Sequence, residues 1–212
     1  MFTMENVMPN KHLTKEYIDT RKYYKKWKFA QSFFEENFID KTVTFYYGID
    51  KRNVSKMTIK LKREHLQHLL GVKYKLSGKT FWRDLKNNRI VWDKLDFCFY
   101  KGVGNQQPKT FENKMSIIDY LPDIITPKAR VATSGNYENI SLDHLLRTSR
   151  PCLALGVKDS LGGGFFNTTL NIRPQISNKG YTKNIKTVYK ISVNDCGSGY
   201  VIFDLLVKEK TA

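Results

Sequence analysis

The chain has few cysteines and no long apolar run. Its 212 residues include only 3 cysteines, Cys98, Cys152 and Cys196, which lie far apart and form no CxxC pair. This pattern argues against both a disulfide framework and a thiolate zinc site. No apolar stretch approaches the roughly 18 residues that a membrane-spanning helix needs, and MFTMENVMPN lacks the basic-then-apolar layout of a secretory signal. We therefore expect a cytoplasmic protein with reduced thiols and no membrane association.

Acidic residues are few compared with basic ones. The chain has 20 Asp and Glu against 36 Lys and Arg, which gives a formal net charge of +16 and a sequence pI near 9.7. An excess of this size predicts a polyanionic partner, either nucleic acid or an anionic membrane surface. Because no segment could span a membrane, we expect RNA, or else DNA, as the partner.

Two motifs of phosphate chemistry are also missing. The glycine-rich stretch SLGGGFF, residues 160–166, is followed neither by Lys-Ser/Thr nor by a helix, so a hairpin turn is the better interpretation. No cluster of Asp and Glu suggests a two-metal nuclease. By elimination, any catalysis is expected to need neither a metal nor another cofactor.

Hydrophobic patterning predicts an α+β fold, with an N-terminal helix or helices followed by a central antiparallel β-sheet with packed helices. Hydrophobic residues make up 41% of the chain, which is enough to bury a core. Residues 11–40 contain neither Pro nor Gly and repeat apolar side chains at three- and four-residue steps, as a helix does. We expect a basic helical extension over residues 1–40 and a single α+β domain over residues 41–212.

Strand patterns occur on both sides of a helical middle. Residues 111–120 are expected to be helical as far as a break at Pro122, and residues 133–141 to form a polar surface loop. Hairpin-sized or polar separators divide the expected strands, which are residues 42–49, 54–62, 151–157, 163–172, 187–193 and 199–207.

Basic residues cluster near aromatic ones in residues 21–28, RKYYKKWK. This mix can hold phosphates and stack bases, or the aromatic side chains can face the core while the basic ones face solvent. Arg147 and Arg150 precede a buried-looking strand, which suits a phosphate clamp but is also an ordinary position for arginine. The candidate nucleic-acid-binding residues are Arg21, Lys22, Lys25, Lys26, Lys60, Lys62, Arg63, Arg150 and Arg173.

Two of the 4 histidines lie in KLKREHLQHLLGV, residues 60–72. His65 and His68 would share one face of a short helix that Gly71 ends. Helical zinc motifs pair histidines at i and i+4 and add a third ligand, which this H-x-x-H stretch lacks, so we expect no metal site. Histidine suits proton transfer because its pKa lies near neutrality, but composition alone does not separate that role from packing.

The order of segments resembles a phage-associated nuclease family of the barnase–EndoU–colicin–RelE-like superfamily. An aromatic strand, VTFYYGI, and a second strand ending in bases, MTIKLK, precede HLQHLLGV. The family's His-Leu-x-Gly motif is matched by His68, Leu69, Leu70 and Gly71. The similarity continues through FENKMSIIDYLPDIIT, as the middle helix, to the hairpin CLALGVKD…GGFFNTTL, and covers about residues 42–207.

The resemblance implies a compact α+β fold and metal-independent cleavage of RNA by a toxin, a phage-defence effector or a phage-encoded nuclease, with an antitoxin or immunity protein as a partner. The 2′-hydroxyl would attack the adjacent phosphate and leave a 2′,3′-cyclic phosphate and a free 5′-hydroxyl. By chemical type and the family motif, His68 would be the general base or acid, and Arg147 and Lys158 would hold the phosphate. A hydroxyl of the second hairpin strand, Thr168 or Thr169 with Thr169 preferred, would orient it. Second-tier candidates are His65, Arg150 and Arg173.

The main alternative is a protein without chemistry, which coats nucleic acid or inhibits a nucleic-acid complex of the host on behalf of a phage or mobile element. The nuclease hypothesis requires His68 and two basic groups to converge in one site. The binding hypothesis requires only a continuous basic surface, with His68 packed inside.

Overall fold

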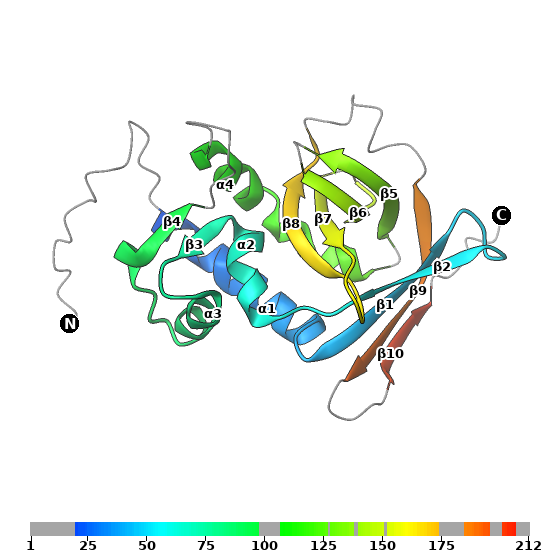
Figure 1. Cartoon of the computed structure of the whole chain (residues 1–212), viewed down its shortest axis with the longest axis horizontal. Helices are drawn as coiled ribbons and strands as arrows, with labels where there is room; N and C mark the ends of the chain where they lie inside the picture. Colours follow the sequence, from blue (N-terminus) through cyan, green and yellow to red (C-terminus); the bar gives the residue numbers. More distant parts are fainter. Residues whose placement is uncertain are drawn as a thin grey trace.

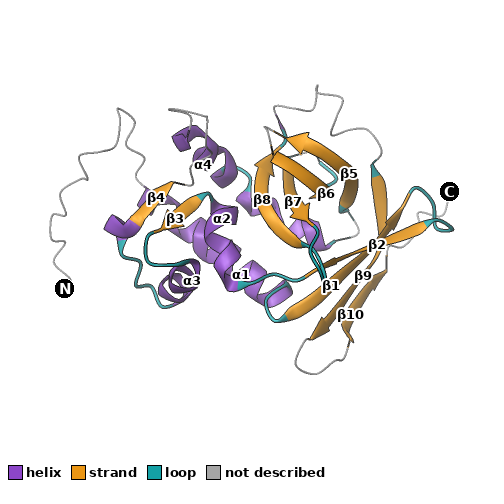
Figure 2. Ribbon diagram, viewed as in Figure 1, coloured by secondary structure: helices purple, strands orange, loops and turns teal. Residues whose placement is uncertain are grey.

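Most helices gather at one end of the molecule, and a curled β-sheet occupies the other (Figures 1 and 2). The structure is a computed structural model that describes residues 20–97, 107–126, 128–137, 140–150, 152–173, 185–195 and 201–206. Its helical elements are η1 (Thr20–Tyr23), α1 (Tyr24–Asn37), η2 (Arg63–His65), α2 (Leu66–Leu70), α3 (Gly78–Lys86), η3 (Trp92–Lys94), α4 (Gln107–Met115) and η4 (Ile118–Ile125). Within these ranges, no helix has the length and apolar character needed to cross a membrane.

The described strands pair antiparallel and confirm the expected α+β class. The main sheet has the order β2-β1-β9-β5-β6-β7-β8, and β10 also pairs with β9, while β3 and β4 form a separate two-stranded sheet. The strands are β1 (Lys41–Gly48), β2 (Val54–Ile59), β3 (Val72–Tyr74), β4 (Leu95–Phe97), β5 (Arg130–Tyr137), β6 (Ile140–Arg147), β7 (Leu153–Lys158), β8 (Phe165–Asn171), β9 (Lys186–Asp195) and β10 (Val201–Leu206).

The sheet curls until its first and last strands meet. The Lys60 N–H, just after β2, donates to the Gly164 carbonyl at 2.9 Å, and the Gly164 N–H donates to the Thr58 carbonyl at 2.8 Å. One face of the sheet packs in the main hydrophobic core. The other face carries a smaller buried cluster, made of Ala132, Leu142, Leu145, Ala154, Leu170 and Ile172.

Helix α1 belongs to the main core and is not a peripheral addition. Its sequence lacks Pro and Gly, and its apolar face buries Trp27 and Phe34 completely. The Trp27 ring lies 5.9 Å from that of Trp92 and 6.0 Å from that of Phe81, centroid to centroid. The domain boundary expected at residue 40 stays a prediction, but the helix before it packs with the elements after it.

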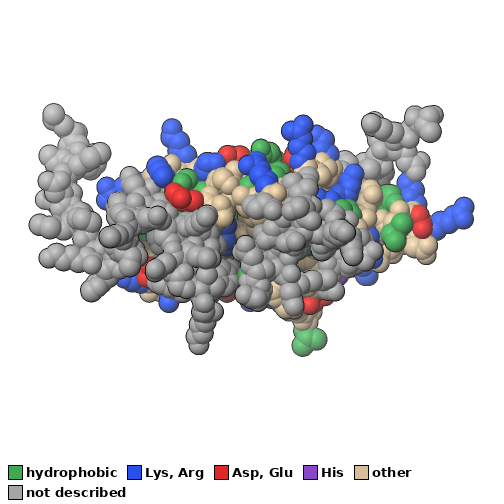
Figure 3. All heavy atoms as spheres, turned by 90° about the horizontal axis from the view of Figure 1, so that it is seen from above, with side chains coloured by type: hydrophobic (Ala, Val, Ile, Leu, Met, Phe, Trp, Pro, Cys, Tyr) green, Lys and Arg blue, Asp and Glu red, His purple; other side chains and the backbone are tan. Residues whose placement is uncertain are grey.

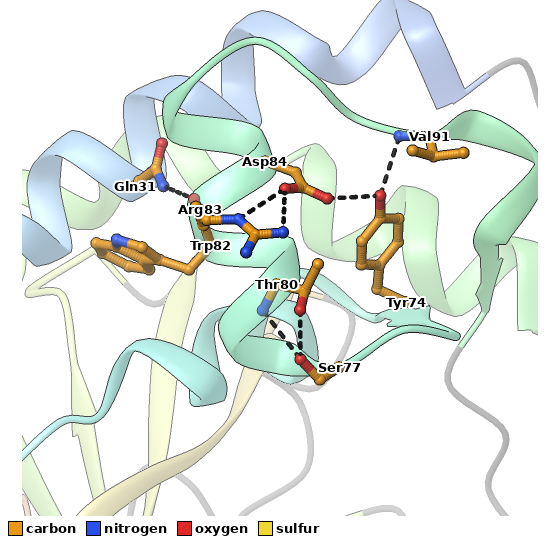
Figure 4. Close-up of polar contacts among 8 residues, drawn as sticks. All are labelled: Gln31, Tyr74, Ser77, Thr80, Trp82, Arg83, Asp84 and Val91. Carbon is orange, nitrogen blue, oxygen red and sulfur yellow. Dashed lines mark hydrogen bonds and ion pairs between the residues drawn. The ribbon is translucent and has the colours of Figure 1, made fainter.

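Polar groups join α1, α3 and β3 within this helical end (Figure 4). The buried Gln31 amide of α1 donates to the Trp82 carbonyl at 2.7 Å. The Tyr74 hydroxyl donates to the Asp84 carboxylate and accepts the Val91 N–H, both at 3.0 Å. Because buried polar groups are costly without partners, these bonds help to select one arrangement of the helices.

One expectation about the middle of the chain is wrong, and another is right only in part. Within the stretch expected to be a surface loop, residues 133–137 and 140–141 are instead paired backbone of β5 and β6, with Gly135 opposite Leu142. Backbone hydrogen bonds do not depend on side-chain polarity, so a polar stretch can pair when its partner strand is buried. The expected helix over residues 111–120 stops as an α-helix at Met115 and continues as η4, since Pro122 lacks the N–H that an α-helix interior requires.

We expect Trp27→Ala to lower the free energy of unfolding by about 3–5 kcal/mol, because it removes a fully buried indole from the core. Phe29→Ala, on the same helix, is the matched control. Because the Phe29 side chain is 39% exposed, removing it should change the free energy of unfolding by about 0.5 kcal/mol or less. Urea unfolding followed by circular dichroism measures the free energy of unfolding of both variants. Equally small decreases in the two variants would contradict the burial of α1 in the core.

Candidate functional site

The histidine stretch folds into η2 and α2, which pack against β8. Gly71 ends α2 in the left-handed conformation, with φ of 77°, as its position in the sequence predicts. The Nδ1 of His65 accepts the Lys62 N–H at 3.5 Å, and the His65 ring lies 5.2 Å from the Phe165 ring of β8. Burial lowers the pKa of His65. Helix capping and packing therefore account for His65.

His68 lies beside a buried lysine from α4, where α2, α4 and β8 meet (Figure 1). Lys114 is only 3% exposed. Its ammonium group donates to the His68 carbonyl oxygen at 3.1 Å and to the Thr168 hydroxyl at 3.3 Å. Burying an ammonium group carries a desolvation penalty, which hydrogen bonds such as these offset.

The surroundings of His68 disfavour its protonated form. Burial is the largest cause, and the positive charges of Lys114 and His65 add to it, so that the pKa of His68 falls from 6.5 to about 4. The imidazole is therefore neutral at pH 7 and can accept a proton. Among the described residues there is no group of three or more His, Cys, Asp and Glu that could hold a metal ion.

Arg147, at the end of β6, is a second buried cation. It is 6% exposed, and in the described part of the chain its Nε has no hydrogen-bond partner. Its partner across the strands is Arg130 of β5. Burial and then the positive charge of Arg130 lower the pKa of Arg147. Two adjacent guanidinium groups, one of them buried, form a site that a bound anion would stabilise.

Arg147 and Thr168 lie on the same face of the sheet. Arg147 is opposite Ala154 of β7, which is opposite Leu170 of β8, and Thr168 comes two residues before Leu170. Two strand spacings and two residues along a strand correspond to roughly 12 Å between the Cα atoms of Arg147 and Thr168. The guanidinium group and the hydroxyl bonded to Lys114 therefore flank the same patch of sheet.

The structure places two of the expected catalytic residues elsewhere. Thr169 is fully buried, alternates with Thr168 to the opposite face of β8, and has a hydroxyl without a hydrogen-bond partner among the described residues. Lys158 lies 3.6 Å from the Asp143 carboxylate, next to a contact of 3.4 Å between the His144 Nε2 and the Asp159 carboxylate. The hydroxyl that Lys114 contacts is that of Thr168.

The candidate nucleic-acid-binding residues are spread over several elements, and Figure 3 shows Lys and Arg side chains projecting along much of one face. In residues 21–28 the packing interpretation is correct for Trp27, which is buried in the core. Lys26 donates to the Met115 carbonyl and pairs with Asp119, and Arg63 pairs with Asp40. A binding role stays a prediction for all these candidates, of which the exposed ones are Arg21, Lys22, Lys25, Lys60, Lys62, Arg63, Arg150 and Arg173.

Sequence reasoning missed Lys114 and Arg130. A signal for Lys114 exists, because it stands at helical spacing from Phe111 and Ile118 and therefore on the apolar stripe of its helix. Arg130 carries no such signal. It becomes a neighbour of Arg147 only through the register of β5 and β6.

The curled antiparallel sheet, the helices at one end and the buried cations beside a neutral histidine define a basic α+β protein equipped for phosphate chemistry. The chain belongs to a nuclease family described as phage-Barnase-EndoU-ColicinE5/D-RelE like nuclease4, whose model matches residues 28–197. This match confirms the resemblance expected from residues 42–207 and extends it into α1. No curated protein and no solved structure matches the chain.

The low pKa of His68 predicts a pH-dependent stability. The pKa of His68 in the folded protein lies below its unfolded value of 6.5. The contribution of neutral His68 to the stability is therefore complete above about pH 6.5 and is lost as the pH falls toward 4. Between pH 7.5 and pH 5 the free energy of unfolding should therefore fall by roughly 2 kcal/mol. His68→Gln should lack this part of the pH dependence. Urea titrations of both proteins at both pH values measure it, and identical pH slopes would contradict the shift.

Proposed function

We propose that this nuclease is a metal-independent endoribonuclease of the toxin, phage-defence or phage-encoded kind. The 2′-hydroxyl of RNA gives its proton to His68 while its oxygen bonds to the adjacent phosphorus. The bond from phosphorus to the 5′-oxygen breaks, and that oxygen takes up a proton from solvent. The products are a 2′,3′-cyclic phosphate and a free 5′-hydroxyl.

The observation that carries the proposal is the buried Arg147, which shares a sheet face with Thr168. A phosphate between them would give the Arg147 Nε the acceptor that it lacks among the described residues, close to Arg130 on the neighbouring strand. The Thr168 hydroxyl would orient that phosphate, and the Lys114 ammonium beside it would stabilise the charge that develops on the phosphate oxygens. We therefore assign the phosphate contacts to Arg147, Arg130 and Lys114, and the orienting hydroxyl to Thr168.

A bound phosphate also completes the role of His68. In the free protein, burial first and then the positive charges of Lys114 and His65 lower the pKa of His68 to about 4. An anion beside these cations offsets the part of the shift that they cause and raises the pKa of His68, which makes the imidazole a better proton acceptor. Substrate binding would thus activate the base.

Arg147→Met should reduce cleavage of total RNA in EDTA by about 10²–10³-fold, because a donor to the phosphate is lost. Arg89→Met is the matched control, since Arg89 is exposed and is not among the candidate binding residues, and the rate of this variant should stay within about 3-fold of the wild type. Gel analysis gives the rates, and mapping of the RNA ends tests for cyclic phosphate. Equal losses in both variants would argue against a specific phosphate contact at Arg147.

Lys114→Met should remain folded and yet lose cleavage by about 10²-fold or more. Circular dichroism and the melting temperature check that Lys114→Met is folded, so that the loss of cleavage reports the missing ammonium group. Full activity in Lys114→Met would remove Lys114 from the reaction. A wild-type protein that cuts RNA only when a divalent metal is added would overturn the metal-independent mechanism.

RNA binding without cleavage by the wild type, in EDTA and with added metal alike, would favour the alternative of a non-catalytic binding or inhibitor protein. In that case His68→Gln should change the affinity little. Variants of the exposed lysines should then weaken binding about uniformly across RNA sequences and reduce its salt dependence.

A further inference from the structure

The face of β1 that points away from the main core carries an aromatic residue between two lysines. Along β1, Phe45 and Tyr47 are buried, and Tyr46 between them is partly exposed on the other side. Tyr46 is the Cα partner of Lys56 on β2 and of Lys190 on β9. The three strands lie next to one another in the sheet (Figure 1). A Lys-Tyr-Lys row therefore crosses three adjacent strands on one face.

The neighbouring row is made of hydroxyl residues. Thr44 is the Cα partner of Thr58 on β2 and of Ser192 on β9, and the Thr44 and Thr58 hydroxyls lie 3.1 Å apart. Within the described residues, the acidic residue in register with these rows is Asp204 of β10, opposite Ser192. Two lysines and a row of hydroxyl residues thus lie next to Tyr46 on this face, and Asp204 stands at the β10 end of the hydroxyl row.

The contacts of Tyr46 suit an anionic, flat ligand. The Lys190 ammonium lies 5.6 Å from the centroid of the Tyr46 ring, and Lys56 on the other side is exposed. Aromatic side chains between cations bind single-stranded nucleic acid, because an unpaired base stacks on the ring while the cations contact its phosphates. A base pair inside a duplex does not offer that free surface.

This row lies on the same sheet face as the arginine pair. Gly48 comes two residues after Tyr46 and is opposite Thr187, which is opposite Arg130. Two strand spacings and two residues give roughly 12 Å between the Cα atoms of Tyr46 and Arg130. Arg147 is the next residue across the sheet. A chain of a few nucleotides can span these distances.

We propose that Lys56, Tyr46 and Lys190 form a subsite for unpaired RNA, in which one base stacks on Tyr46 and the lysines contact the phosphates on either side of it. The subsite rests on the proposed function in that it supplies the arginine pair with a scissile phosphate a few nucleotides away. It makes single-stranded regions the substrate class of this nuclease.

The test is fluorescence anisotropy with a labelled 2′-O-methyl oligonucleotide, which lacks the attacking hydroxyl, as a single strand and as a duplex. Tyr46→Ala should weaken single-strand binding by about 10-fold or more, and Tyr46→Phe by about 2-fold or less, because the stacking face is kept. In Lys56→Gln/Lys190→Gln, the slope of log affinity against log salt should fall in magnitude by about 1.4. Lys79→Gln, on α3, is the matched charge control and should leave the slope nearly unchanged.

Unchanged single-strand affinity in Tyr46→Ala, or equal loss of single-strand and duplex affinity, would overturn the subsite. If Tyr46→Ala does not fold, the lysine pair and Tyr46→Phe decide the question. On cleavable RNA, Tyr46→Ala should raise KM and leave kcat within about 3-fold, as loss of binding away from the reacting atoms predicts. If the wild type binds RNA through Tyr46 but does not cleave it, the subsite is supported and the endoribonuclease is refuted. If the wild type cleaves RNA but its binding does not depend on Tyr46, the endoribonuclease is supported and the subsite is refuted.

Discussion

Two backbone hydrogen bonds at Gly164 hold together the parts on which the site depends. They join β2, the first strand in the order of the sheet, to the start of β8, the last. Since α2 follows β2 after only a few residues, this closure places His65 against Phe165 and His68 near Thr168. A Cβ at Gly164 would lie 3.0 Å from the Val157 side chain and 3.2 Å from the Lys158 carbonyl. A side chain at position 164 would therefore require its neighbours to shift by a few tenths of an ångström, so glycine suits this closure.

Buried positive charge is the second constraint on the molecule. Lys114 and Arg147 are both more than nine-tenths buried, and both lie beside other groups that carry or can gain positive charge. Desolvation makes each of these buried charges costly to the folded protein. Under the proposed function a substrate phosphate would offset this cost, so that the strain in the free protein and the affinity for RNA would have the same physical origin.

The fold was largely predictable from residue patterns, and the site only in part. Residues 42–49 and 54–62 alternate as strands do, residues 24–37 lack helix breakers, and Gly71 stands where α2 ends. The paired strands within residues 133–141 were not predicted, because their side chains are polar and the pairing is made by backbone groups. Which of the adjacent hydroxyls of Thr168 and Thr169 contacts Lys114 depends on the helix that faces β8, and the sequence does not specify that helix.

The sequence by itself determined the excess of positive charge, the α+β class, the position of the histidine stretch and the membership of a nuclease family, because these follow from composition, periodicity and a short motif. Only the tertiary structure decided which cations are buried, that Arg130 stands beside Arg147, and that Tyr46 shares a face with both. These properties depend on strand order and register, which bring distant residues together through backbone hydrogen bonds that no local pattern encodes.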